Sequence, residues 1–177
     1  MTYRIMKRFF NITSIVAALL MIAASSPSAS AQAFDADYDF KIFTGYLNKG
    51  GKSGIQIGAE YGRSRFFSFG GFVQGLFGIK DEDGESNFFK NTDLQFRCNF
   101  HWTDVMHLPS TFDIYTGVNL SLRAGGLQAG VRYNFSERFG LYGEVQQPLF
   151  KTFSSGDFDN RYFNKKFGFS AGFTINL

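Results

Sequence analysis

Apolar and polar side chains alternate along most of the chain after residue 36. Successive side chains of a β-strand point to opposite faces of a sheet, so this alternation predicts strands with one apolar and one polar face. The stretch 93–102 shows the pattern without a break. Its apolar positions are Leu94, Phe96, Cys98, Phe100 and Trp102, and polar residues lie between them.

Residues 125–150 have the form of a β-hairpin. The first limb alternates from Leu127 to Phe135, Ser136-Glu137-Arg138 reverses the chain, and a second alternating limb begins at Phe139. Two such limbs joined by three polar residues are typical of a hairpin. An isolated hairpin is only marginally stable, so further strands must flank this one.

The same pattern predicts eight strands in all. They cover about residues 37–47, 53–62, 66–79, 93–102, 112–122, 127–135, 139–150 and 166–177. Short turns join most of them, and two longer polar loops, Lys80–Lys90 and Lys151–Arg161, complete the chain. An even number of strands joined by hairpin connections favours an all-β fold, an eight-stranded antiparallel up-and-down β-barrel.

The first 31 residues have the features of a secretory signal peptide. Arg4, Lys7 and Arg8 precede an apolar run from Ile12 to Ala24, and Ala29-Ser30-Ala31 fits a cleavage site. The apolar run is shorter than the roughly 20 residues that a spanning helix needs. We therefore predict a signal peptide at residues 1–31 and one barrel domain at residues 32–177.

Removal of the leader changes the charge of the chain. The whole sequence has 18 basic and 15 acidic residues, and three of the basic ones lie in the leader. The mature chain is formally neutral, which gives no support for binding of nucleic acid. Cys98 is the single cysteine, so an internal disulfide is excluded.

Alternation leaves open which face of the sheet meets water. An eight-stranded barrel is only just wide enough to be filled by side chains, and most of the Phe, Tyr and Trp residues share the apolar face. Packing them into the lumen would overfill it. We therefore expect the apolar face outside against lipid, and a sealed, salt-bridged lumen without an open pore. Its predicted charges are Arg97, Arg132 and Lys166 with Glu60, Asp93, Asp113 and Glu144.

Aromatic residues flank three of the predicted connections, and all three connections fall at the same end of an up-and-down barrel. An aromatic ring of this kind is typical of a membrane–water boundary. The tendency of aromatic residues to form strands is an alternative explanation of the same residues, and we favour the ring. The ring comprises Tyr61, Phe67, Trp102, Phe112, Phe135 and Phe139.

The segments GVRYNFSERFGLYGEV and FGFSAGFTINL, together with the leader, resemble small outer-membrane β-barrel proteins of Gram-negative bacteria. In architecture the chain resembles the eight-stranded OmpA-type domain. In sequence it is more similar to a set of uncharacterised outer-membrane barrels. The resemblance implies outer-membrane lipid and the barrel-assembly machinery as partners. Many members end in Phe, whereas this chain ends in Leu177 with Phe173 four residues earlier.

Chemical motifs are weak. Gly51-Lys52-Ser53 lacks the earlier glycine of a phosphate-binding loop and lies in a hairpin. His101 and His107 lack the spacing of a metal site. We expect no catalytic, cofactor-binding or metal-binding residues and no cofactor.

The sequence therefore predicts an integral outer-membrane barrel with a structural or surface-interaction role, whose contact surfaces are the loops Lys80–Lys90 and Lys151–Arg161. An extracellular partner is not indicated. One alternative is a secreted soluble barrel that binds a small apolar ligand. A less favoured one is a lipid-modifying outer-membrane enzyme, in which Ser121 and His101 would have to meet at one rim.

Overall fold

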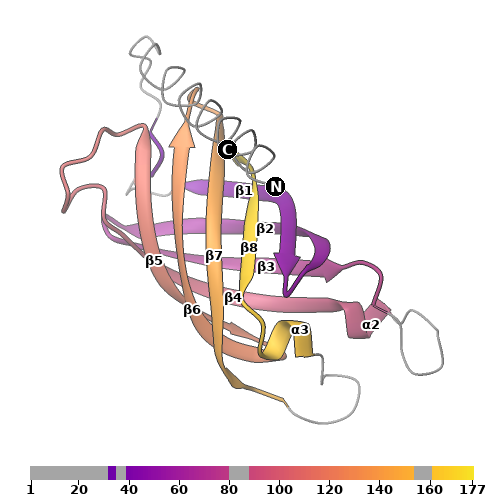
Figure 1. Ribbon diagram of the computed structural model, residues 1–177. Coiled ribbons are helices and arrows are strands. Elements are labelled where there is room, and N and C mark those ends of the chain that lie inside the picture. The colour runs from indigo at the N-terminus through magenta and orange to yellow at the C-terminus, as the bar shows by residue number, and fades with distance from the viewer. Residues whose placement is uncertain (1–31, 35–38, 80–87, 154–160) are drawn as a thin grey trace, which may run out of the picture.

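The computed structural model describes residues 32–34, 39–79, 88–153 and 161–177. Eight strands form one closed barrel, with every strand hydrogen-bonded to its neighbours in sequence (Figure 1). The strands are β1 (Phe40–Lys49), β2 (Lys52–Ser64), β3 (Phe67–Leu76), β4 (Thr92–His101), β5 (Phe112–Ser121), β6 (Ala124–Asn134), β7 (Phe139–Lys151) and β8 (Gly168–Asn176). Two short helices, α2 (Phe88–Asn91) and α3 (Arg161–Asn164), precede β4 and β8. The predicted all-β antiparallel up-and-down barrel is confirmed.

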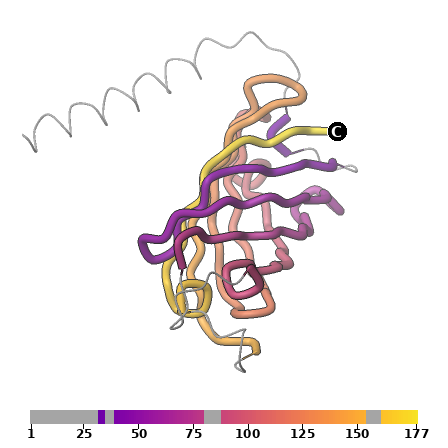
Figure 2. Tube along the Cα trace, turned by 90° about the vertical axis from the view of Figure 1, so that its right-hand side faces the viewer, coloured from indigo at the N-terminus to yellow at the C-terminus, as the bar shows by residue number. Residues whose placement is uncertain are grey.

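The barrel closes by antiparallel pairing of its first and last strands. The ladder runs from Lys41 opposite Asn176 to Lys49 opposite Gly168. Figure 2 shows these two strands side by side, one indigo and one yellow. Because β1 and β8 pair, neither strand leaves an open edge in the sheet.

Three predicted boundaries were wrong. We expected the third strand to reach Ile79, but β3 ends at Leu76, and Gly78 adopts a φ of 68° that leaves the β conformation. We expected the sixth strand to begin at residue 127, but β6 begins at Ala124. The last strand begins at Gly168, so Lys166 lies before it and is exposed.

The two ends of the barrel differ. At one end lie the start of β1, the end of β8 and the connections after β2, β4 and β6. We call this the terminal end. At the other end, the helix end, α2 and α3 precede β4 and β8, while β1 and β2 are joined by Gly50 and Gly51, both with positive φ.

The predicted signal peptide at residues 1–31 lies outside the described residues, as do residues 80–87 and 154–160 of the two predicted loops. Of these loops the structure describes only the flanks. Lys90 belongs to α2, Lys151 ends β7 and Arg161 begins α3. Among the described helices, none has the length and apolar character that would let it cross a bilayer.

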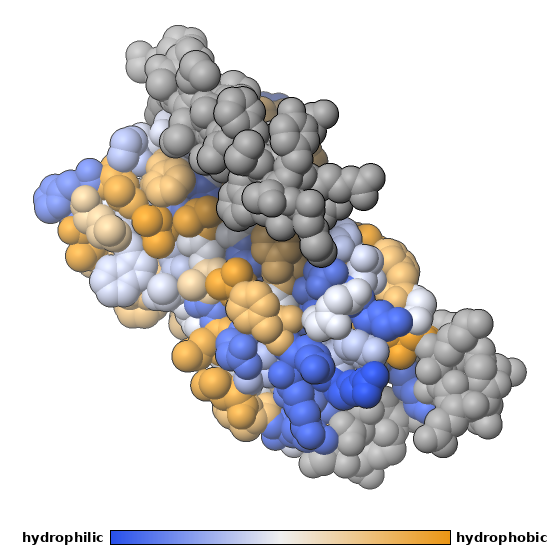
Figure 3. All heavy atoms as spheres, in the orientation of Figure 1, coloured by the Kyte–Doolittle hydropathy of each residue, from blue (hydrophilic) through white to orange (hydrophobic). Residues whose placement is uncertain are grey.

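The outer face of the barrel is apolar. Phe96 is 56% exposed and Val131 and Phe169 are each 44% exposed, as expected for side chains that point outward. In the space-filling view, apolar residues lie over the strands, and hydrophilic residues gather around α3 (Figure 3). Other outward apolar residues are Ile55, Ile57, Phe69, Val73, Leu94, Val118, Leu120, Leu127, Val145 and Phe173. The predicted orientation of the two faces is therefore confirmed.

The inner face carries the buried charges together with a few rings. Phe43, Phe72 and Tyr142 form one buried cluster, with ring centroids 5.3 Å and 5.2 Å from that of Phe43. Glycine makes room for these rings, since a Cβ atom added to Gly58 would overlap the ring of Phe72. Gly71, which pairs with the residue next to Gly58, has open space at the same position.

This difference predicts that Gly58→Ala is destabilising and that Gly71→Ala is not. The added methyl group of Gly58→Ala displaces the Phe72 ring inside a packed lumen, which costs about 1–3 kcal/mol of unfolding free energy. Urea unfolding of the two purified variants measures the difference. Equal stability of the two variants would contradict the close packing around Phe72.

Candidate functional site

The middle of the lumen is crossed by a network centred on Arg97 of β4. The guanidinium lies 2.9 Å from a carboxylate oxygen of Glu144 on β7, and donates a 2.7 Å hydrogen bond to Gln56 on β2. It also lies over the ring of Phe72, 3.6 Å from the centroid. One side chain therefore ties three separate walls of the barrel together.

A second link at this level joins opposite walls directly. Gln74 of β3 donates hydrogen bonds to Gln56 at 2.7 Å and to Gln146 of β7 at 3.2 Å. In the order of the closed barrel, β3 and β7 are four strands apart in either direction. The lumen is therefore narrow enough for two glutamines to span it, which fits an eight-stranded barrel.

Nearer the terminal end, Arg132 of β6 pairs with Glu60 of β2 at 2.7 Å. These strands are also four apart in the ring. The Arg132 guanidinium lies 4.9 Å from the ring centroid of Phe43 and 4.0 Å from Asp113. Glu60 accepts a further hydrogen bond from Asn99 at 2.8 Å. Both charges are buried and paired, as a low-dielectric interior requires.

Near the helix end, Arg123 extends into the barrel from the turn before β6 and is buried. It donates to the backbone oxygens of Phe89 and Thr92 and lies 3.9 Å from Asp93. Its guanidinium faces the ring of Phe163 in α3 at 5.4 Å. This residue therefore connects both short helices to the lumen.

A further polar side chain of the lumen, His101 of β4, lies beside Arg132 and Glu60 at the terminal end. Its Nδ1 is 2.8 Å from an Asp113 oxygen, and its Nε2 is 2.8 Å from the Ser68 hydroxyl. The other Asp113 oxygen accepts a 2.7 Å hydrogen bond from Thr103. Ser68, His101 and Asp113 thus form a continuous hydrogen-bonded chain across β3, β4 and β5, and all three are at most 1% exposed.

The segment 32–34 covers this chain. Phe34 stacks on the His101 ring with centroids 3.6 Å apart and planes 5° apart. The backbone oxygen of Ala33 accepts a 3.2 Å hydrogen bond from Arg132, and that of Gln32 accepts one at 2.7 Å from Asn134. We call residues 32–34 the covering segment.

Most of the charged residues that the alternation predicts to point into the lumen do so. Arg97, Arg132 and the four predicted acids are all buried in the lumen. The prediction for Lys166 was wrong, because the register of β8 does not extend to the turn before it. The predicted inward acids are Glu60, Asp93, Asp113 and Glu144.

The lipid-modifying alternative required Ser121 and His101 to meet at one rim, and the structure does not bring them together. Along β4, Ser121 pairs with Gln95, whereas His101 pairs with Tyr115. The two residues are therefore at different ends of the barrel, about 20 Å apart at the usual rise per strand residue. His107 lies in the connection between β4 and β5, with a φ of 54°.

Sequence reasoning missed Lys41, Lys49 and Arg123, which are buried at 1–2% exposure. Lys41 and Lys49 occupy inward positions of β1, so its alternation contained the signal. Arg123 and the covering segment lie outside any strand pattern, so no periodicity could reveal them.

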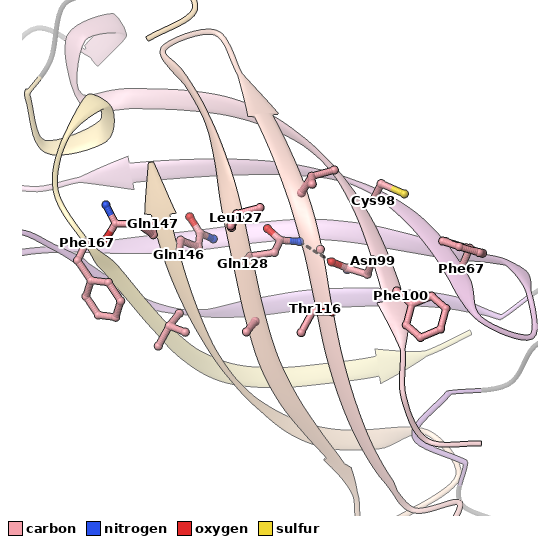
Figure 4. A pocket seen from close by; sticks show the side chains of 14 residues that line it. Phe67, Cys98, Asn99, Phe100, Thr116, Leu127, Gln128, Gln146, Gln147 and Phe167 are labelled. Carbon is pink, nitrogen blue, oxygen red and sulfur yellow. Dashed lines mark hydrogen bonds between the residues drawn. The ribbon is translucent and has the colours of Figure 1, made fainter. Parts of the chain in front are cut away.

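The outer face of β4–β7 has a shallow apolar groove with a volume of about 600 Å³ (Figure 4). Phe67 and Phe100 lie at one end and Phe167 at the other, and the small side chain of Thr116 lies between them. Ala129, which also lines the groove, pairs with Thr116. The groove runs along the apolar exterior, and the Asn99–Gln128 hydrogen bond of 2.5 Å joins inward-facing residues of the same strands.

No group of three or more His, Cys, Asp or Glu side chains is placed to hold a metal ion in the part of the chain that the structure describes. The described site is instead a set of ion pairs and hydrogen bonds that fills the lumen. Some of these interactions join opposite walls of the barrel.

These features define a closed, eight-stranded antiparallel β-barrel with an apolar exterior and a charged interior. The chain belongs to the family described as "Family of unknown function (DUF6646)", which matches residues 26–177. No curated protein matches the sequence significantly. One similar solved structure is titled "Asymmetric conductivity of engineered proteins", with 14% identity and a TM-score of 0.30. The similarity covers 81% of this chain and 42% of that chain, so this chain spans less than half of its length.

The cross-lumen pairs predict that Arg97→Met is strongly destabilising. Loss of the guanidinium leaves Glu144 as an unpaired buried charge, at a cost of about 3–5 kcal/mol of unfolding free energy. Urea unfolding of the purified variant measures this cost.

Arg65→Met is the matched control, since the Arg65–Asp104 pair is exposed and its loss costs less than about 1 kcal/mol. The double variant Arg97→Met, Glu144→Gln should regain part of the lost stability, because it removes both charges. Equal effects of Arg97→Met and Arg65→Met would argue against a lumen held by ion pairs.

Proposed function

We propose that this protein is an integral outer-membrane β-barrel with a structural or surface-interaction role, an apolar belt in lipid and a sealed polar interior. The observation that carries the proposal is the inverted distribution of side chains. Charges lie inside and large apolar residues lie outside, which is the arrangement of a membrane barrel.

The strand lengths support this proposal. The strands contain 9 to 13 residues, and a tilted membrane-spanning strand needs about 9–11. The apolar exterior extends around the whole barrel, whereas monomeric soluble proteins rarely expose contiguous apolar patches larger than a few hundred Å². Lipid would satisfy this surface, and the groove across β4–β7 would accept an acyl chain.

Aromatic residues at both ends add further support. The predicted ring at the terminal end continues through Phe100, which lies 5.3 Å from Phe67 and 4.8 Å from Trp102 by ring centroids. A second group, absent from the sequence prediction, lies at the helix end. It comprises Phe77, Phe88, Phe89, Phe150, Phe153 and Phe167, all exposed. Aromatic girdles at both ends of an apolar belt are typical of outer-membrane barrels.

The proposal also gives an orientation. Outer-membrane barrels have short periplasmic turns and longer extracellular connections. The helix end, with α2 and α3, would therefore face outward, and the terminal end would face the periplasm. Export through a cleaved signal peptide and insertion by the barrel-assembly machinery belong to the same proposal, and no extracellular partner is part of it.

The soluble-carrier alternative places an apolar ligand in the lumen. The lumen is instead crossed by Arg97–Glu144 and Arg132–Glu60, which would have to break to admit an apolar molecule. These crossings favour the membrane proposal.

Trp102 provides a direct test, because it is the single tryptophan and lies in the aromatic ring of the terminal end. We expect the membrane fraction to hold the mature protein and its fluorescence to be quenched by brominated acyl chains. Bromine near the headgroup should quench more strongly than bromine near the bilayer centre. Recovery in the soluble periplasm without detergent, with no quenching, would reject the membrane proposal.

The sealed interior predicts that the purified protein in planar bilayers gives no steady ionic conductance. The ion pairs and glutamine hydrogen bonds that cross the lumen would obstruct a continuous column of water. Single-channel recording measures this property. Steady, reproducible conductance steps would contradict the sealed lumen while leaving the membrane location intact.

A further inference from the structure

The chain Ser68–His101–Asp113 has the order of a nucleophile, a base and a group that orients the base. The Asp113 carboxylate can only accept hydrogen bonds, so His101 Nδ1 carries the proton at their 2.8 Å contact. His101 Nε2 is then the acceptor for the Ser68 hydroxyl at 2.8 Å. Thr103 holds the second Asp113 oxygen at 2.7 Å, which fixes the carboxylate.

Other described serines in the lumen lack such a base. Ser170 is equally buried, but its hydroxyl contacts Gln56 at 3.5 Å. Ser121 accepts backbone hydrogen bonds from Arg123 and Ala124 at 3.1 and 2.9 Å, an ordinary turn contact. Ser68 therefore differs from these two serines in its hydrogen bond to a histidine, whereas all three serines are buried.

The charged groups around His101 suit a reaction in which its imidazole ring accepts a proton. Glu60 lies 3.9 Å from Nε2 and would stabilise the imidazolium formed when the serine proton moves to the ring. Arg132 donates to the backbone oxygen of Ala33 at 3.2 Å, and its Nε donates to no other described residue. A guanidinium that already holds one carbonyl oxygen is suited to stabilise the oxyanion of a substrate carbonyl in its place.

The covering segment stands where a substrate would have to bind. Gln32 is exposed, Ala33 is buried and Phe34 is half-buried on the His101 ring, so the segment extends from solvent to the His101 side chain. Its described contacts with the lumen are hydrogen bonds and the stacking of Phe34 on His101. Its withdrawal would leave a flat slot beside His101 and a free donor on Arg132.

We propose that Ser68 is the nucleophile of a serine esterase-type site, with His101 as base, and that Phe34 covers it. The substrate class is a small carboxylic ester with an aromatic group that replaces the Phe34 ring. This site goes beyond the proposed membrane role and stands or falls independently of it.

In the reaction, Ser68 Oγ attacks the ester carbonyl carbon while its proton moves to His101 Nε2, and Arg132 stabilises the oxyanion. The carbon–oxygen bond to the leaving alcohol breaks as His101 returns the proton to it, which leaves an acyl-serine. Water, deprotonated by His101, then attacks the acyl carbon and releases the carboxylic acid. Asp113 acts as a positioning residue through His101.

The test treats the purified mature protein with a fluorophosphonate, whose phosphorus accepts Ser68 Oγ as fluoride leaves, and maps the label by mass spectrometry. We expect the label on Ser68, its loss in Ser68→Ala, and no change in Ser170→Ala. His101→Gln should slow labelling by about 100-fold or more, since general-base catalysis contributes at least that factor. Phe34→Ala should accelerate labelling about 10-fold and allow hydrolysis of p-nitrophenyl acetate, an estimate based on removal of one stacked ring.

Circular dichroism and resistance to unfolding in SDS establish that each variant keeps the barrel. Absence of label from Ser68 in a folded Phe34→Ala protein would overturn the proposal, as would equal labelling of Ser170. Because the assay follows the label on one residue, its result does not depend on whether the protein is recovered from membrane or from solution.

Discussion

The ion pairs that cross the lumen are the constraint on which the rest of the structure depends. Arg97–Glu144 and Arg132–Glu60 join strands that are not neighbours in the ring. The barrel is therefore held together by contacts across its lumen as well as by hydrogen bonds between adjacent strands. An isolated buried charge costs several kcal/mol, and each of these charges has a partner and further hydrogen bonds. These charged groups are paired inside the lumen, and the bulky apolar side chains occupy the outer face.

This arrangement also explains the distribution of small residues. Inward positions next to the aromatic rings are glycine, since Gly58 meets Phe72 and Gly130 meets Tyr115. The rings in turn face the guanidinium groups of Arg97 and Arg132, so apolar and charged side chains share one packed interior. A narrow barrel has room for large cationic side chains only because adjacent inward positions are glycine.

Much of the fold follows from alternation alone, because a two-residue period specifies both the strands and their two faces. What alternation leaves out is register. Ser68, His101 and Asp113 are each inward by pattern, but the stagger of β3, β4 and β5 decides that they meet, and that Ser121 does not. Lys166 and Arg123 occupy turns, where the period does not apply and a side chain follows local geometry. The covering segment forms no strand, and its place depends on contacts with residues about 70 to 100 positions away.

The pairing of β1 with β8 has a consequence for synthesis. β8 is the last of the eight strands to leave the ribosome, so no partial chain that lacks it can pair both borders of the sheet. All eight strands must be present before the hydrogen-bonded wall is continuous, and such long-range closure is intrinsically slow. Until that moment the nascent protein exposes two unpaired strand edges, each of which is a template for pairing with another chain.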